Sequence, residues 1–362
     1  MIVIDCDGTS TSDAEPVAIS LLMEKKADKM CRHTYFEWLP FLKAVFESLH
    51  SHESLASNEE ILVIPAGSVP KGTATVDSDW DAFIVIPSCF EVDAYVKCSP
   101  TWGLKTCADL LKRKVAVTLG PYSFQYKNHY FNKKKKMEVC ELLVKYKNGE
   151  NTFSCNVDVS ACQVGNIRSV LWVRSYSMTD PCIQDAFVQI KRLAFSLQLN
   201  ITSSGTLCNW GWELLILISL FMLGIIPVID PLFRISKQYL SVVSCTSRKD
   251  FDSDAHHVLL SLSTRDLKVF SNLKVFTLLE ILRQIDDMLA PKLFVEQTVI
   301  RLRDCGFIPC VPHCLVIVDP CEQFSPGNNA ASAVSPEGLF KIRNGVKTLI
   351  ASLGKCKKRK YT

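Results

Sequence analysis

The spacing of apolar and polar residues changes along the chain and predicts two kinds of domain. Between residues 61 and 161, short apolar runs of strand length alternate with turn residues, which predicts a mixed α/β sheet domain. From Ile167 to Leu289 the apolar residues recur mostly at helical spacing. Two more helices are expected within residues 15–52, a strand at 315–319 and a last helix at 337–353. The pattern therefore predicts an α+β fold.

One hairpin is predicted from its turn. Asn148-Gly149 separates two strand-like runs, residues 137–147 and 151–160, and Asn-Gly in this position is a strong hairpin signal. Asp158 lies between two valines in the second run, where burial is expected. A buried carboxylate requires a partner, so Asp158 becomes a candidate site residue.

Two further acids stand one residue apart in another strand-like run. Asp79 and Asp81 precede the apolar run 82–86, and residues two apart in a strand project from the same face. Their carboxylates would repel each other unless a cation lies between them. Upstream, Gly67 permits close approach of a backbone to a phosphate, and Ser68 offers a hydroxyl. These residues predict a metal-dependent site for a nucleoside triphosphate, with Asp158 as the third acid.

These residues resemble a known signature. Gly67-Ser68, the segment 77–81 and Asp158 look like the catalytic motif of the polymerase-β-type nucleotidyltransferases. Further blocks, at residues 176–181, 205–212, 316–320 and 329–335, are similar in order and spacing to those of the terminal RNA nucleotidyltransferases, which comprise the terminal uridylyltransferases and the divergent poly(A) polymerases. The resemblance covers the chain from about Ala66 to Ile350.

The resemblance implies a two-lobed architecture, with a mixed-sheet catalytic (palm) domain, a mostly helical second domain and an active site in the cleft between them. It places the catalytic domain at residues 55–164 and the helical, poly(A)-polymerase-associated domain at 165–354, with a nucleotide-recognition segment at 315–350. Residues 1–54 would form N-terminal helices that pack on the second domain. Residues 355–362 form a basic tail.

The resemblance also implies an activity: template-independent transfer of UMP or AMP from the NTP to an RNA 3′-hydroxyl by a two-metal mechanism. Asp79, Asp81 and Asp158 would be the catalytic residues and would hold Mg²⁺ or Mn²⁺. Trp210 would stack on the base in place of the family's usual Tyr. The nucleotide would be bound by the set Gly67, Ser68, Asn166, Lys191, Asn209, Trp210, Glu322 and Asn328.

Some positions depart from the family pattern, and several alternatives stay open. The family often has a second Lys where this chain has Phe195, a ribose-contacting Asn where it has Ser169, and an Arg where it has Ser332. An inactive RNA-binding relative is therefore one alternative, and an oligoadenylate- or cyclic-dinucleotide-synthase-like enzyme is another. Asn328 replaces a His found in many uridylyl-adding members, which slightly favours adenine, whereas Glu322 could select uracil by another route, so uracil and adenine stay near parity.

Composition adds bounds on the partners. The 362 residues are 48% hydrophobic and carry a net charge of +4, with dense lysine runs at 133–136 and 355–360; each run is a candidate RNA contact or a solvated tip. The 16 cysteines are scattered, which favours reduced thiols. The most apolar stretch, Leu214–Ile226, is too short for a membrane span.

Expected partners are UTP or ATP, a single-stranded RNA 3′ end and an accessory RNA-binding protein, without a membrane. The expected location is cytoplasmic, with nucleus and mitochondrion as alternatives.

Overall fold

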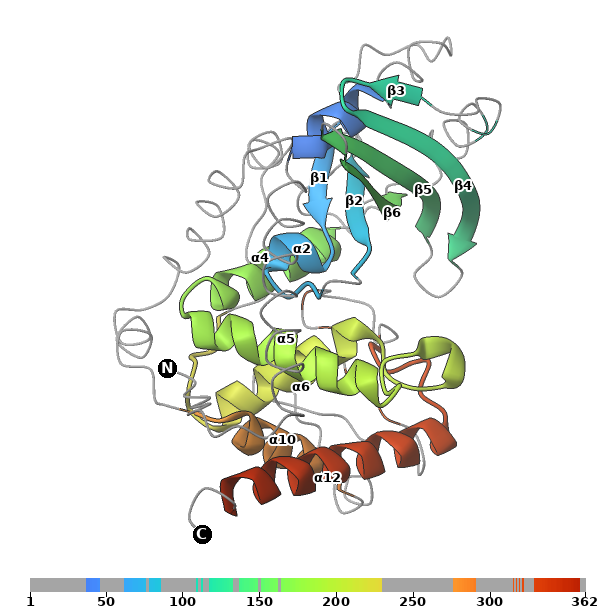
Figure 1. Cartoon of the computed structure of the whole chain (residues 1–362). Coiled ribbons are helices and arrows are strands. Elements are labelled where there is room, and N and C mark those ends of the chain that lie inside the picture. The colour runs from blue at the N-terminus through green and yellow to red at the C-terminus, as the bar shows by residue number, and fades with distance from the viewer. Residues whose placement is uncertain are drawn as a thin grey trace. The chain divides into compact units, whose positions relative to one another are not determined.

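The computed structural model shows two compact units (Figure 1). Of the residues described, those from 37 to 175 form the sheet unit, and those from 176 to 229 and from 276 to 358 form the helical unit. The described residues are 37–45, 62–75, 78–85, 109, 112, 117–132, 137–148, 151–161, 164–229, 276–290, 315, 317, 319, 321 and 329–358.

A six-stranded sheet forms the centre of the sheet unit. Its order is β1-β2-β6-β5-β4-β3. The strands are β1 (Leu62–Ala66), β2 (Trp80–Val85), β3 (Val117–Leu119), β4 (Tyr122–Asn132), β5 (Met137–Asn148) and β6 (Asn151–Ala161). Among the described strands, β2 and β6 pair in parallel, and the pairs β1–β2, β3–β4, β4–β5 and β5–β6 are antiparallel. The predicted mixed sheet is confirmed.

The predicted hairpin is the β5–β6 pair. Asn148 pairs with Asn151, so the ladder extends to the last described residue of β5 and the first of β6. Alternate residues of both strands are buried, including Leu142, Val157 and Val159, which is the period expected for a strand with one face in a core.

Helical residues 37–45 pack on the apolar face of the sheet. The Trp38 ring stacks on Trp80 of β2 with centroids 5.4 Å apart, and it also contacts Phe124 of β4 at 6.4 Å. For this segment the packing therefore differs from the expectation that residues 1–54 pack on the helical domain. Trp80 explains the difference, because its large apolar ring on the sheet needs a cover. The rest of 1–54 lies outside the described residues.

Helices of the helical unit follow in sequence after α4 (Val164–Ser177), which begins in the sheet unit and ends in the helical one. They are α5 (Pro181–Ser196), the 3₁₀ turn Thr202–Ser204, α6 (Asn209–Met222), α10 (Leu278–Met288) and α12 (Pro336–Lys358). Helix α10 packs against both α6 and α12, and α5 packs against α6 (Figure 1). The apolar α6 thus lies within the core, as its sequence predicts.

Local chemistry explains where these helices begin. Asp180 caps α5 by accepting a hydrogen bond from the Cys182 backbone N–H at 2.6 Å, with Pro181 at the first helical position. Thr277 and Glu280 form a reciprocal capping box at the start of α10. None of the helices in the described part of the chain is long and apolar enough to cross a bilayer.

The strand expected at 315–319 is not formed by its described residues 315, 317 and 319. The Asn329 side chain bonds to the backbone of this segment: its Oδ1 accepts from the Ile317 backbone N–H at 2.8 Å, and its Nδ2 donates to the Leu315 carbonyl at 3.1 Å. The Ala330 N–H also donates to the Ile317 carbonyl at 2.8 Å. The apolar residues Leu315 and Ile317 are buried as predicted, and their backbone groups bond to the Asn329 side chain and to the Ala330 backbone N–H.

Candidate active site

Two of the predicted aspartates are brought together by strand register. Asp81 of β2 is the direct partner of Asp158 on the parallel strand β6. Asp158 is in turn paired with Glu141 of β5. Directly paired residues project from the same face of a sheet, so the three carboxylates form a row across neighbouring strands about 4.8 Å apart. We call Asp81, Asp158 and Glu141 the acid row.

Gly67 lies against the end of this row. It has φ of +72°, a conformation that a glycine adopts without strain, and a Cβ placed on it would lie within van der Waals overlap of the Asp81 carboxylate. The glycine therefore has two separate reasons to be present: its backbone conformation and its contact with Asp81. The sequence predicts a close approach of the Gly67 backbone to a phosphate, and that stays a prediction; the neighbour found in the structure is the Asp81 carboxylate.

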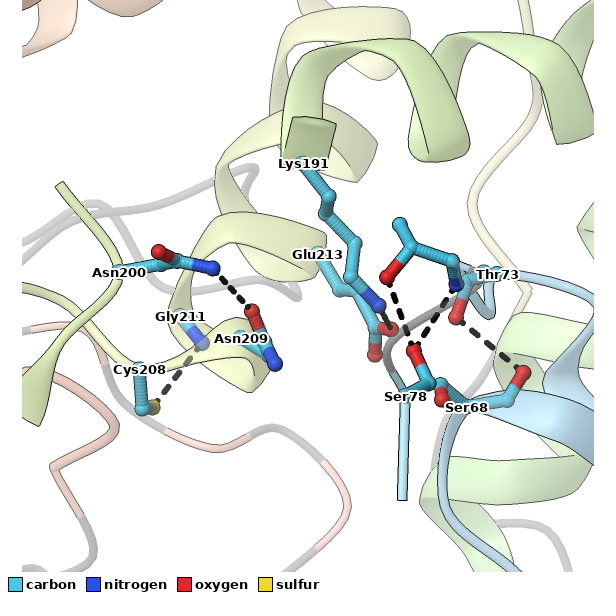
Figure 2. A network of polar contacts seen from close by, with 10 residues as sticks. Ser68, Thr73, Ser78, Lys191, Asn200, Cys208, Asn209, Gly211 and Glu213 are labelled. Carbon is cyan, nitrogen blue, oxygen red and sulfur yellow. Dashed lines mark hydrogen bonds and ion pairs between the residues drawn. The ribbon is translucent and has the colours of Figure 1, made fainter. Parts of the chain in front are cut away.

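The segment after Gly67 is a single helical turn, α2 (Ser68–Lys71), held by its own backbone. The Thr73 backbone N–H donates to the Ser68 carbonyl at 2.9 Å, and the Thr73 hydroxyl donates to the same oxygen at 3.5 Å (Figure 2). Gly72 closes the turn in a left-handed conformation. Further on, the Ser78 hydroxyl accepts from the Thr75 backbone N–H at 2.9 Å. These contacts hold two parts of the chain between Gly67 and Asp79: the turn at Ser68–Thr73, and the Thr75–Ser78 pair just before Asp79.

The donor set fits a hard divalent cation in its chemistry. Asp79 is exposed just before β2, and Asp81 is partly exposed on the same face. Within the described residues, no group of three or more His, Cys, Asp or Glu side chains is arranged to hold a metal ion. A Mg²⁺ ion that arrives with a nucleotide needs only one or two protein carboxylates, because phosphates and waters supply its other ligands. Asp81 and Asp158, with Asp79 beside them, meet that smaller requirement.

The pKa of Tyr130 on β4 is affected by the negative charge of the acid row. Burial raises the pKa of its phenol, and the negative charges of Asp158, Glu141 and Asp81 raise it further. The effect of a charge on a neighbouring pKa weakens with the distance between the two groups. The Tyr130 hydroxyl thus belongs to the surroundings of the acid row.

Lys191, a predicted triphosphate contact, is buried in the helical unit. Its ammonium lies 3.1 Å from Glu213 Oε1, and both side chains are only 2% exposed (Figure 2). Lys191 comes from α5 and Glu213 from α6, so the ion pair joins these two helices. The predicted phosphate contact of Lys191 stays a prediction, and within the helical unit its ammonium has the Glu213 carboxylate as a partner.

Trp210, the predicted base-stacking residue, lies in the first turn of α6. Its indole N–H donates to Asp319 Oδ2 at 2.8 Å, while Asp319 Oδ1 accepts from the Cys321 backbone N–H at 2.9 Å. The ring orientation is therefore fixed by a carboxylate from the segment expected to recognise the nucleotide. Asn209, one residue earlier, contacts the Asn200 amide at 3.0 Å (Figure 2).

The remaining predicted site residues lie partly within and partly outside the described residues. Asn166 is partly buried in the first turn of α4, and its carbonyl accepts from the Ser169 hydroxyl at 2.8 Å. Phe195, at the position where the family often has a second lysine, is an apolar residue that is 57% exposed on α5. Glu322, Asn328 and the lysine run 133–136 lie outside the described residues.

Comparison with known proteins agrees with the fold. No protein-family model matches the sequence. No curated protein matches it either. Among solved structures, the Cid1 poly(U) polymerase with Mg and 3′-dATP bound has a TM-score of 0.53 at 16% identity, over 91% of this chain and 95% of that chain. Cid1 in complex with its short product ApU gives 0.54 at 17%, over 91% and 94%. A cytoplasmic RNA terminal U-transferase gives 0.52 at 15%, over 91% and 94%.

The chain has the terminal uridylyltransferase fold. The predicted nucleotidyltransferase architecture, a mixed sheet with a mostly helical second unit, is thereby confirmed. At these identities the likeness establishes the fold, and the roles of single residues rest on the geometry described above.

Three residues of this candidate site were not predicted from the sequence: Glu141, Tyr130 and Asp319. A signal for Glu141 was present. With Asn148 paired to Asn151, counting back along both strands from the turn sets Glu141 opposite Asp158. For Asp319 no such local signal exists, because its partner Trp210 is distant in sequence.

Replacing Gly67 with Ala is expected to lower nucleotide addition by more than about 100-fold, because the new methyl group would displace the Asp81 carboxylate and strain the backbone. The measurement is the rate of primer extension, with thermal unfolding to confirm the fold. Gly354→Ala is the matched control, since its Cβ meets nothing within 4 Å. Unchanged extension by the Gly67 variant would show that Asp81 has no role in catalysis.

Proposed function

We propose that this chain is an RNA 3′-terminal nucleotidyltransferase that adds UMP or AMP from the NTP without a template. The observation that carries the proposal is the pairing of Asp81 with Asp158 across neighbouring strands, with Gly67 against the Asp81 carboxylate. The fold, which is that of solved terminal uridylyltransferase structures, supports it. Among those neighbours, Cid1 has been solved with Mg and a nucleotide and with the product ApU.

Mg²⁺, or Mn²⁺ in its place, is the proposed cofactor, and Asp79, Asp81 and Asp158 would hold it. When bound with the nucleotide, such ions neutralise the negative charge that develops on the attacking and leaving oxygens. Carboxylate oxygens are the ligands that these hard cations prefer. Asp81 and Asp158 supply them from neighbouring strands of the sheet, where their spacing is set by strand register.

The chain's own residues account for the transfer. The RNA 3′-hydroxyl gives its proton to the Asp158 carboxylate, and its oxygen forms a bond to the α-phosphorus. The bond from that phosphorus to the β-phosphate oxygen breaks, and pyrophosphate leaves. Gly67 allows the chain to turn tightly beside Asp81, and Ser68 follows with a hydroxyl suited to a phosphate oxygen.

Lys191 and Trp210 are proposed to act on the nucleotide from the helical unit. Trp210 offers an aromatic ring to the base, with its orientation fixed by Asp319. Lys191 offers positive charge to the pyrophosphate, with Glu213 holding its ammonium. Asn166, Asn209, Glu322 and Asn328 complete the proposed nucleotide-binding set. The choice between uracil and adenine is proposed to depend on Glu322 and Asn328. An accessory RNA-binding protein and a cytoplasmic location stay proposals from the sequence.

The test is an extension assay on a 5′-labelled single-stranded RNA, with each of the four NTPs supplied separately and Mg²⁺ present. We expect extension with UTP or ATP, complete loss on chelation of the metal, and loss in Asp79→Ala. Asp287→Ala, which removes an exposed carboxylate on α10, is the matched control and should extend normally.

Each of the other outcomes points to an alternative. Synthesis that depends on double-stranded RNA and needs no primer would favour an oligoadenylate-synthase-like enzyme. Binding of the labelled RNA without extension by any NTP would identify an inactive RNA-binding relative. Equal extension by wild type and Asp79→Ala would refute the assignment of that carboxylate.

A further inference from the structure

Strand β4 carries an irregularity beside the acid row. Its pairing with β5 shifts register between Tyr126 and Asn128, which places Lys127 in a β-bulge. A bulge redirects the side chain at its extra residue and is over-represented next to active sites. Here the result is visible in a contact: the Lys127 ammonium donates to Asn156 Oδ1 on β6 at 2.9 Å.

That contact places the lysine on the face of the acid row. Asn156 is two residues from Asp158 on β6, so both side chains project from the same face. To reach Asn156, Lys127 extends across the intervening strand β5. Its ammonium thus lies about two strand residues, roughly 7 Å, from the level of Asp158 along the strand. The lysine is exposed, and its ammonium has further hydrogens to donate.

An aromatic ring lies on the opposite side of the acid row. Tyr130 pairs with Val139 of β5, which pairs with Ser160 of β6. Ser160 is two residues beyond Asp158, in the direction away from Asn156, so Tyr130 shares the same face. Its side chain is 37% exposed. Along the strands, the order on this face is therefore a cation, a row of carboxylates and an aromatic ring.

We propose that Lys127 and Tyr130 form the subsite for the 3′-terminal nucleotide of the RNA primer. The subsite rests on the proposed function, which requires the primer's 3′-hydroxyl at Asp158. Lys127 contacts the terminal phosphodiester, and Tyr130 stacks on the terminal base. The separation between the lysine and the acid row is of the order of one nucleotide. Such a pairing of positive charge and aromatic face is how proteins hold single-stranded nucleic acid without reading its sequence.

The primer is assigned to this end of the row because Gly67 and Ser68 lie at the other end. The sheet order places β1, which leads into Gly67, on one side of β2 and β6, and β5 and β4 on the other. The incoming triphosphate is proposed to occupy the Gly67 side. The β4 side is then left for the second substrate, whose oxygen attacks.

The experiment measures the affinity for a fluorescent single-stranded RNA by anisotropy, and KM separately for RNA and for the NTP in the extension assay. Tyr130→Leu is expected to weaken RNA binding about tenfold or more, whereas Tyr130→Phe, which keeps the ring, should stay near wild type. Lys127→Ala should raise the RNA KM and reduce the dependence of log affinity on log salt by about 0.7, and Lys127→Arg should restore both. The KM for the NTP should not change in any of these variants.

Matched controls exist for both residues. Phe131 is the next residue on β4, is 47% exposed and projects from the opposite face, so Phe131→Leu should bind RNA normally. Lys347→Ala removes an exposed lysine from α12 in the helical unit. If Tyr130→Leu and Lys127→Ala keep the wild-type RNA KM while the wild type extends RNA, the subsite is refuted and the proposed function stands. A change confined to the NTP KM would also refute it. If the wild type extends no RNA with any NTP, both proposals fall.

Discussion

Asp158→Asn is expected to abolish nucleotide addition while leaving the fold intact. Asn has nearly the same shape as Asp, and Asp158 is only partly buried, so the β2–β6 and β5–β6 ladders should persist. The substitution removes the negative charge that the proposed metal ligand and proton acceptor require. Loss of an outer-shell partner of a metal costs about 10- to 100-fold, so loss of a direct ligand should lower kcat by more than about 100-fold.

The measurement is single-turnover primer extension, with thermal unfolding of the same samples. Glu141→Gln is an informative comparison, because Glu141 is in the same row but is not a predicted ligand; its kcat should fall less than that of Asp158→Asn. Asp287→Asn, on the exposed side of α10, should leave both kcat and unfolding unchanged. Extension by Asp158→Asn at the wild-type rate would remove Asp158 from the mechanism.

Lys191→Met is expected to cost the largest amount of stability, about 3–5 kcal/mol in the free energy of unfolding. The substitution leaves the Glu213 carboxylate, 2% exposed in the core between α5 and α6, without the cation that lies 3.1 Å away. Urea-induced unfolding followed by circular dichroism measures the change. Lys341→Met, at an exposed position of α12, is the control and should change the unfolding free energy by no more than about 0.5 kcal/mol.

The double variant Lys191→Met, Glu213→Leu separates the two roles of the lysine. Replacing both members of a buried ion pair with apolar groups is often close to neutral for stability, so unfolding should return toward wild type. If Lys191 also contacts the pyrophosphate, nucleotide addition stays low in this stable protein. If addition recovers with stability, Lys191 serves only to join α5 and α6.

The sheet site was largely predictable because its signals are local. The Asn148-Gly149 dipeptide predicted the β5–β6 hairpin, and the two-residue spacing of Asp79 and Asp81 predicted that their side chains project from the same face. The pairing of Asp81 with Asp158 was inferred from the cost of burying a lone carboxylate, and the structure has it in direct register. These arguments need only strand periodicity and turn chemistry.

The parts that were not predicted depend on contacts between distant residues. The β-bulge at Lys127 leaves no mark in the apolar pattern, because the residues around it are polar. The ion pair of Lys191 with Glu213 joins two helices, and the position of Lys191 in an amphipathic helix gave no sign of burial. The packing of Trp38 on Trp80 likewise follows from which surface is left uncovered, which tertiary structure alone decides.

The parallel pairing of β2 with β6 has a consequence for how the protein reaches its working form. The β4–β5–β6 meander joins neighbours in sequence, whereas β2 and β6 are separated by three intervening strands along the chain. Pairing between distant segments requires a long loop to close, which costs conformational entropy, so such pairings form slowly. Asp81 and Asp158 therefore meet only when that closure is complete, so a partly folded chain has not yet assembled the site of the proposed reaction.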